Sequence, residues 1–183
     1  MVRLLVVAVS MLALTTANAA ADPGRAGTPK SFVDRHHCQI TARLQTLYAA
    51  PDKKPHSDRF IILALKYSPF EFVQCLFEDD NSELLCEASS GFYTAKPGEP
   101  RTYKIKPEGL TELKLLGFSD DDTKGNYSKY IKLTSPSELP AIATLMLTAL
   151  SRGYGANMTS ELEIVAPRGT LAREDDVKCT PLS

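Results

Sequence analysis

Two of the four cysteines offer the most distinctive chemistry in the sequence. Cys75 and Cys86 lie in FVQCLFEDDNSELLCEASSGF, residues 72–92, which has the pattern of two short apolar strands joined by an acidic turn. If the turn is centred on Asp80 and Asn81, antiparallel pairing places the two cysteines opposite each other. Such a pair can form a disulfide, act as a reactive thiol pair or contribute to a metal site.

The reactive alternatives lack their usual sequence context. A thioredoxin-like centre needs a CxxC motif, and a zinc site needs closely spaced ligand pairs. His36, His37 and Cys38 form the only local cluster of ligand residues, and adjacent residues of a helix point in different directions. We therefore expect no metal and no cofactor. A Cys75–Cys86 disulfide is the preferred interpretation, and two buried free thiols are the alternative.

The length of the turn decides the geometry of this pair. A two-residue loop places the cysteines at a hydrogen-bonded position, whereas a four-residue loop, Asp79 to Ser82, places them at a non-hydrogen-bonded position with closer Cα atoms. The sequence leaves both open. A Cys75–Cys86 bridge would leave Cys38 and Cys179 to form Cys38–Cys179, joining the first helix to the C-terminal tail. Four cysteines permit three connectivities, so this pairing is a ranking among them.

Catalytic motifs are equally scarce. The sequence contains no GxSxG elbow, no phosphate-binding glycine loop and no paired-carboxylate motif. The acidic runs EDD and DDD fall in predicted turns, where solvated side chains explain them. We therefore expect a protein that is not an enzyme. The opposite hypothesis requires a deep pocket in which several polar side chains converge. The candidates for it are His36, His37, Glu87, Asp121 and Tyr127.

The same register divides the hairpin into two faces. One face is apolar throughout and belongs to the core; it carries Val73, Cys75, Phe77, Leu84, Cys86 and Ala88. The other face is mixed, with Phe72, Gln74 and Leu76 opposite Leu85 and Glu87. The Gln74 and Glu87 side chains are interpreted as a cross-strand hydrogen-bonded pair. Alternatively, they border a groove for an extended peptide, together with the three apolar side chains.

Hydrophobic periodicity and turn residues predict the elements that hold this hairpin. A helix is expected from Ser31 until Pro51, and a second over residues 106–118 with Pro107 in its first turn and Gly117 at its end. A third, capped by Ser135 or Ser137, should run to Gly153 or Gly155. Strands are expected over 59–67, 70–77, 83–88, 91–96, 102–106, 127–133 and 161–167. Strands segregated from helices indicate an α+β fold, an antiparallel twisted sheet covered by helices on one face.

The N-terminus has the pattern of an export signal. Residues 1–21 combine Arg3, an apolar run from Leu4 to Leu14 and small residues before a cleavage point after Ala19 or Ala21. The run of about 11 residues falls short of the roughly 20 that span a bilayer, so no stable membrane insertion is expected. Residues 22–30 read as a flexible leader and 31–183 as a single α+β domain. With 21 basic and 22 acidic residues, the chain gives no indication of a nucleic-acid partner.

Several of these segments together resemble a known family. The pattern FVQ…LLCEASSGFY…GLTELKLLGFS…NYSKYIKL…ELPAIATLMLTALSRGYG…ELEI is similar to the TY-Chap-type domain. This group belongs to the type III secretion chaperone-like superfamily, alongside the bacterial sensory-transduction-regulator domain. The shared features are Phe72-Val73-Gln74, Glu87 on the partner strand, Leu116-Gly117-Phe118, an Asn-Tyr stretch and a final long helix. The resemblance covers residues 58–166.

The resemblance implies a compact, secretion-chaperone-like α+β domain that binds polypeptide, commonly dimerises and has no catalytic residues. We therefore expect an exported, periplasmic or extracellular, chaperone-like protein that binds a protein or peptide client. An envelope protein fits that role, and a homodimer is compatible with it. The candidate peptide-binding face comprises Phe72, Gln74, Leu76, Leu85 and Glu87. The alternatives are a small periplasmic hydrolase or ligand carrier that reuses the fold, and a structural or inhibitory envelope protein.

Overall fold

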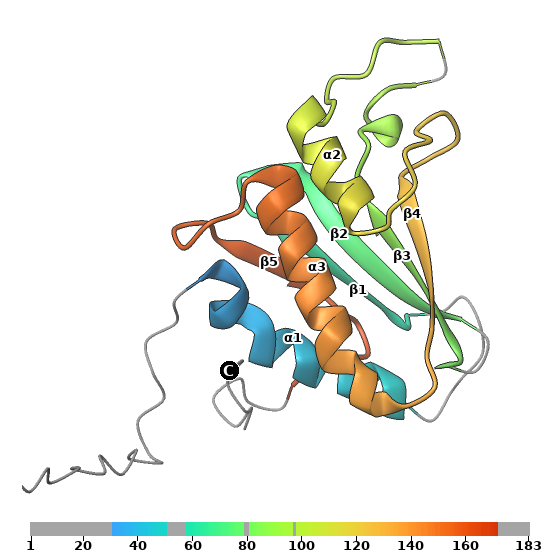
Figure 1. The fold of residues 1–183 in the computed structure, drawn as a ribbon, viewed down its shortest axis with the longest axis vertical. Helices are drawn as coiled ribbons and strands as arrows, with labels where there is room; N and C mark the ends of the chain where they lie inside the picture. The colour runs from blue at the N-terminus through green and yellow to red at the C-terminus, as the bar shows by residue number, and fades with distance from the viewer. Residues whose placement is uncertain (1–30, 51–57, 79–80, 97, 172–183) are drawn as a thin grey trace, which may run out of the picture.

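The computed structural model describes residues 31–50, 58–78, 81–96 and 98–171. The predicted signal peptide, the leader and Cys179 lie outside the described residues. A five-stranded antiparallel sheet packs against three α-helices, which all lie on one face of the sheet (Figure 1). The predicted α+β fold class is therefore confirmed.

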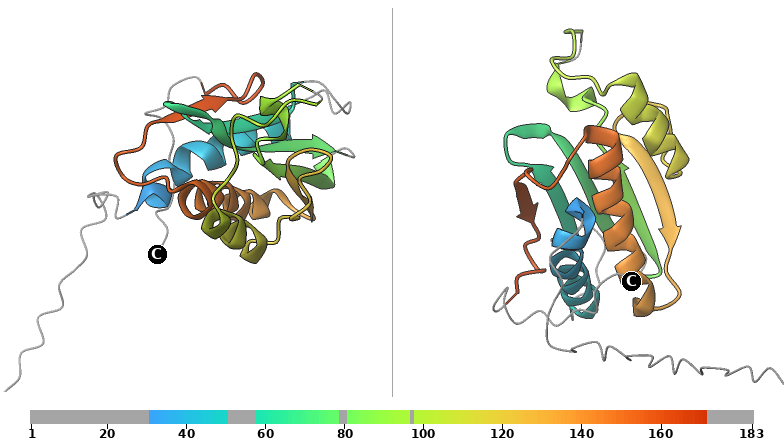
Figure 2. Two further views of the ribbon diagram at one scale, coloured as in Figure 1. Left: turned by 90° about the horizontal axis from the view of Figure 1, so that it is seen from above. Right: turned by 60° about the vertical axis from the view of Figure 1, so that its left-hand side comes forward.

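The sheet has the strand order β4-β3-β2-β1-β5, and every neighbouring pair is antiparallel. Its first four strands form a meander in chain order, and the last strand returns to the free side of the first. The strands are β1 (Phe60–Leu65), β2 (Ser68–Glu78), β3 (Glu83–Ala88), β4 (Tyr127–Lys132) and β5 (Leu162–Val165). The sheet is twisted, and Figure 2 shows the helices stacked beneath it.

The helices begin and end where their capping residues place them. In α1 (Phe32–Ala49) the side chain of Ser31 accepts a hydrogen bond from the backbone N–H of Asp34 at 3.1 Å. Helix α2 (Pro107–Leu115) starts with proline, and α3 (Leu139–Tyr154) follows a 3₁₀ turn capped by Ser135. Gly155, with φ of 79°, ends α3. None of the helices in the described ranges is long and apolar enough to cross a membrane.

The core lies between the sheet and the helices. It is built from the inward side chains of β1, β2 and β3 and the apolar stripes of α1 and α3. These residues include Ile40, Leu44, Leu47, Ile61, Leu63, Val73, Phe77, Leu84, Leu139, Met146 and Leu150, all of them fully or almost fully buried. The two predicted faces of the hairpin are thus correctly assigned, because one set of side chains lies in this core.

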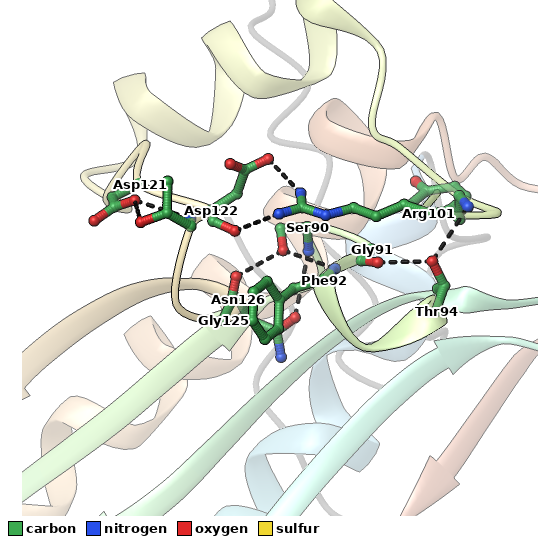
Figure 3. A network of polar contacts seen from close by, with 11 residues as sticks. Ser90, Gly91, Phe92, Thr94, Arg101, Asp121, Asp122, Gly125 and Asn126 are labelled. Carbon is green, nitrogen blue, oxygen red and sulfur yellow. Dashed lines mark hydrogen bonds and ion pairs between the residues drawn. The ribbon is translucent and has the colours of Figure 1, made fainter. Parts of the chain in front are cut away.

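The predicted edge strands over 91–96 and 102–106 are wrong. Residues Phe92–Thr94 form a 3₁₀ turn instead, preceded by Gly91 with φ of 79°. The Ser90 hydroxyl accepts a hydrogen bond from Phe92 N–H at 3.1 Å and donates one to the Gly125 carbonyl at 2.7 Å (Figure 3). Thr94 Oγ1 donates to the Gly91 carbonyl at 2.7 Å. Side-chain bonds of this kind compete with a strand ladder, and β4 takes the place beside β3.

Arg101 holds the loop that follows this 3₁₀ turn in place. Its guanidinium donates to Asp122 Oδ2 at 2.6 Å and to the Asp122 carbonyl at 2.7 Å (Figure 3), and it lies 5.3 Å from the centre of the Phe92 ring. The loop before α2 is therefore tied to the loop before β4.

Candidate functional site

Cys75 and Cys86 form a disulfide across β2 and β3, with Cα atoms 4.1 Å apart and both residues fully buried. Strand β2 ends at Glu78 and β3 begins at Glu83, which matches the four-residue spacing. Because Phe77 N–H donates to the Arg59 carbonyl of the preceding segment, the odd-numbered residues of β2 bond toward β1. Cys75 therefore faces Cys86 at a non-hydrogen-bonded position. A buried disulfide is typical of proteins from oxidising, exported environments.

The second predicted bridge has a different status. Cys38 is partly buried on α1 and forms no disulfide within the described residues. Since Cys179 lies outside them, Cys38–Cys179 stays a prediction.

The face of the sheet opposite the helices carries the candidate site. We call it the outer face; it consists of the alternate side chains of the five strands that point away from the core. All five predicted residues lie on it and are half-buried: Phe72, Gln74, Leu76, Leu85 and Glu87. The observed register pairs Gln74 with Glu87 and Leu76 with Leu85, as the sequence predicts.

An apolar row crosses the outer face at right angles to the strands. Phe60, Leu76, Leu85 and Tyr130 are consecutive partners across β1, β2, β3 and β4. Three of them shelter one another and are half-buried, whereas Tyr130 at the edge is 62% exposed. No α-helix of the described chain covers this row (Figure 2).

A mixed row runs beside the apolar one. It consists of Ser128, Glu87, Gln74, Ile62 and Val165 from the five strands in spatial order. Gln74 Nε2 donates to Glu87 Oε2 at 2.5 Å, so the predicted cross-strand pair is present. This bond holds both side chains along the sheet, beside the apolar row.

Sequence reasoning missed five of the nine residues in these two rows. The residues not singled out are Phe60, Ile62, Ser128, Tyr130 and Val165. The alternation of Ser128, Tyr130 and Lys132 was a usable signal for β4. The position of Val165 needed the pairing of β5 with β1, which no local pattern specifies.

A pocket of about 230 Å³ lies between β2, the segment before α2 and the end of α3. Its lining includes Glu71, Tyr103, Lys106, Arg152 and Tyr154. Burial raises the pKa of both tyrosines above its usual range, with nearby Glu71 adding to the effect. The Tyr154 hydroxyl donates to the Ser89 carbonyl at 2.7 Å.

The polar residues that an enzyme would require to converge lie apart. His37, buried on α1, donates from Nε2 to the Pro140 carbonyl at 3.0 Å. Glu87 lies on the outer face, and Tyr127 is buried on the opposite side of the sheet. Asp121 lies in an exposed loop, where it accepts hydrogen bonds from Thr123. The described residues contain no group of three or more His, Cys, Asp or Glu side chains placed to hold a metal.

The environment of His36 predicts how the stability of the protein depends on pH. Burial, assisted by the charge of Arg35, lowers its pKa from the usual value of 6.5. Its Nε2 is enclosed without a hydrogen-bond partner among the described residues, and its ring lies 4.9 Å from the Phe32 ring. The folded protein therefore favours neutral His36, whereas the unfolded chain takes up a proton as the pH falls below about 6.5. Stability is expected to decrease from that pH downward until the folded pKa is passed.

Urea unfolding of the wild type and of His36→Gln at pH 7.5 and pH 5 checks this expectation. The wild type should lose more stability between the two pH values than the variant, because glutamine has no proton to gain. Equal losses in both proteins would contradict the assignment of His36 as the titrating group.

Comparison with family models, with curated proteins and with solved structures gives no match for this chain. The resemblance to the TY-Chap-type domain therefore stays a prediction, and the outer face has to be interpreted from its own geometry.

Proposed function

We propose that this protein is an exported, non-enzymatic, chaperone-like domain that holds a polypeptide partner on the outer face of its sheet. The single observation that supports this proposal best is the apolar row of Phe60, Leu76, Leu85 and Tyr130, which no described helix covers. Contiguous apolar side chains left on a protein surface are characteristic of interaction sites.

The disulfide on the core side of the sheet is consistent with the same role. Cys75 lies between Gln74 and Leu76, and Cys86 lies between Leu85 and Glu87. The covalent link thus joins the two strands at the centre of the outer face while its sulfur atoms stay in the core. A rigid face loses little conformational freedom when a partner binds, which favours affinity.

A periplasmic or extracellular location fits these features. The buried disulfide requires an oxidising environment to form, and the predicted signal peptide would deliver the chain there. Partners are accordingly expected among exported or envelope proteins.

Site-specific photocrosslinking tests the proposal. We expect a photoreactive phenylalanine analogue at Tyr130 to yield discrete adducts with another protein in cells that normally make this chain. The same analogue at Leu115, which is 74% exposed on α2, is the matched control and should yield few or none. Absence of adducts at Tyr130, or equal adducts at both positions, would refute a binding site on the outer face.

A further inference from the structure

We propose that the outer face is built for a basic amphipathic helix, one whose apolar stripe is flanked on both sides by Lys or Arg. This inference rests on the proposed function and specifies the chemistry of the partner.

The charges of the outer face support it. Four carboxylates point from this face, from Glu78, Glu83, Glu87 and Glu163, and the one ammonium group on its strands is that of Lys132. Two further ion pairs each combine one positive and one negative side chain, so they add no net charge. They are Lys66 with Glu161 at 2.5 Å and Arg168 with Asp58 at 3.8 Å. The whole chain has a net charge of only −1, so the negative charge is a local property of this face.

The arrangement of these charges favours a helix over an extended strand. Glu78 and Glu83 pair with each other on one side of the apolar row, with Lys132 as the next partner of Glu83, and Glu87 lies on the other side of the row. Successive outward residues of a strand are about 7 Å apart, so carboxylates flank the row on both sides at that distance. A helix lying along the row presents an apolar stripe with long cationic side chains at both margins. An extended strand directs alternate residues away from the surface and lacks those two margins.

The dimensions agree as well. Adjacent strands are about 4.8 Å apart, so the apolar row from β1 to β4 spans about 14 Å. A helix covers this distance in about ten residues, or three turns, at 1.5 Å per residue.

The same charges disfavour two other occupants. A second copy of the chain would bring one acidic face against another, which like-charge repulsion opposes. An anionic lipid surface would be repelled for the same reason.

The protein contains no Trp, so a peptide with one Trp reports its own binding by fluorescence. Three synthetic helical peptides of about five turns share one Leu/Trp stripe and differ only in the flanks, which are Lys, Gln or Glu. We expect the Lys-flanked peptide to bind the oxidised protein at least about tenfold more tightly than the Glu-flanked peptide at low salt, with a smaller difference at high salt.

Two variants locate the effect. Glu78→Gln/Glu83→Gln should lower the affinity for the Lys-flanked peptide about tenfold, since it removes the carboxylates on one side of the row. Glu99→Lys changes the net charge by the same amount at an exposed position outside the sheet, and it should leave the affinity within about twofold. Circular dichroism verifies that both variants are folded.

Equal affinity for all three peptides, or equal weakening by both variants, overturns the inference and leaves the proposed function intact. Failure of every peptide to bind also overturns it, and so does crosslinking of position 130 to a second copy of this chain. The proposed function is tested separately by the photocrosslinking experiment. It fails if no adducts form at Tyr130, whatever the charge of the partner.

Discussion

Gly109→Ala is expected to destabilise the protein by about 3 kcal/mol, because it forces apart two helices that touch backbone to backbone. Gly109 lies in α2, and a Cβ atom there would overlap the carbonyl oxygen of Gly153 in α3. In an exposed helix the same substitution would stabilise by about 1 kcal/mol, since alanine is the better helix former. The predicted change therefore has the opposite sign to that of helix propensity. Urea unfolding of the oxidised protein, followed by circular dichroism, measures it.

Gly153→Ala is the matched control for this contact. A Cβ atom at Gly153 would lie 2.8 Å from Leu113 Cδ2, which belongs to a side chain that can rotate. The loss of stability should therefore be smaller than for Gly109→Ala, although Leu113 is fully buried. A neutral or stabilising Gly109→Ala, or the reverse order of the two variants, would show that α2 and α3 are not in backbone contact.

The parts of the fold that follow local rules could be predicted from the sequence. The pairing of Gln74 with Glu87 followed from one turn and the alternation of apolar residues, because a slip of one residue would turn every core side chain outward. The helical start after Ser31, the proline in the first turn of α2 and the glycine that ends α3 are equally local signals. These rules fixed the helices and the central hairpin.

The errors arise where distant contacts override a local pattern. The alternation in residues 91–96 is compatible with a strand, yet Ser90, Thr94 and Arg101 bind backbone and side-chain groups that a ladder would leave apart. The hydrogen bond from Ser90 to Gly125 and the ion pair of Arg101 with Asp122 join segments that are about 20 to 35 residues apart. Sequence periodicity contains no information about such partners.

The candidate site could be predicted from the sequence only in part. Register placed five of its residues correctly on one face, but whether a helix covers that face depends on where α1, α2 and α3 pack. The carboxylates beside the apolar row come from β2 and β3, but the row itself is complete only when β1 and β4 lie on either side of that hairpin. The chemistry of the partner could therefore be inferred from the assembled sheet and not from the hairpin alone.

Removal of the Cys75–Cys86 disulfide, by Cys75→Ala/Cys86→Ala, is expected to destabilise the protein by about 3 kcal/mol. The two cysteines are 11 residues apart, and closing a loop of that size removes about this much chain entropy from the unfolded state. The cavity left by two fully buried sulfur atoms adds to the loss. The free energy of unfolding of the mature protein, purified without reductant, provides the measurement. Where titration leaves Cys38 as a free thiol, Cys38→Ala is the control and should cost less than about 1 kcal/mol.

The same variant separates stability from function. Because Leu76 and Leu85 sit next to the bridged cysteines, loss of the bridge loosens the centre of the apolar row, and binding of the Lys-flanked peptide should weaken even where the variant is fully folded. Thiol titration of the denatured wild type without reductant tests the bridge itself. Two free thiols indicate Cys75–Cys86 alone, none indicates that Cys38 and Cys179 are also joined, and four would contradict both. A double variant as stable as the wild type would mean that packing against α3, rather than the covalent link, holds β2 to β3 beneath the outer face.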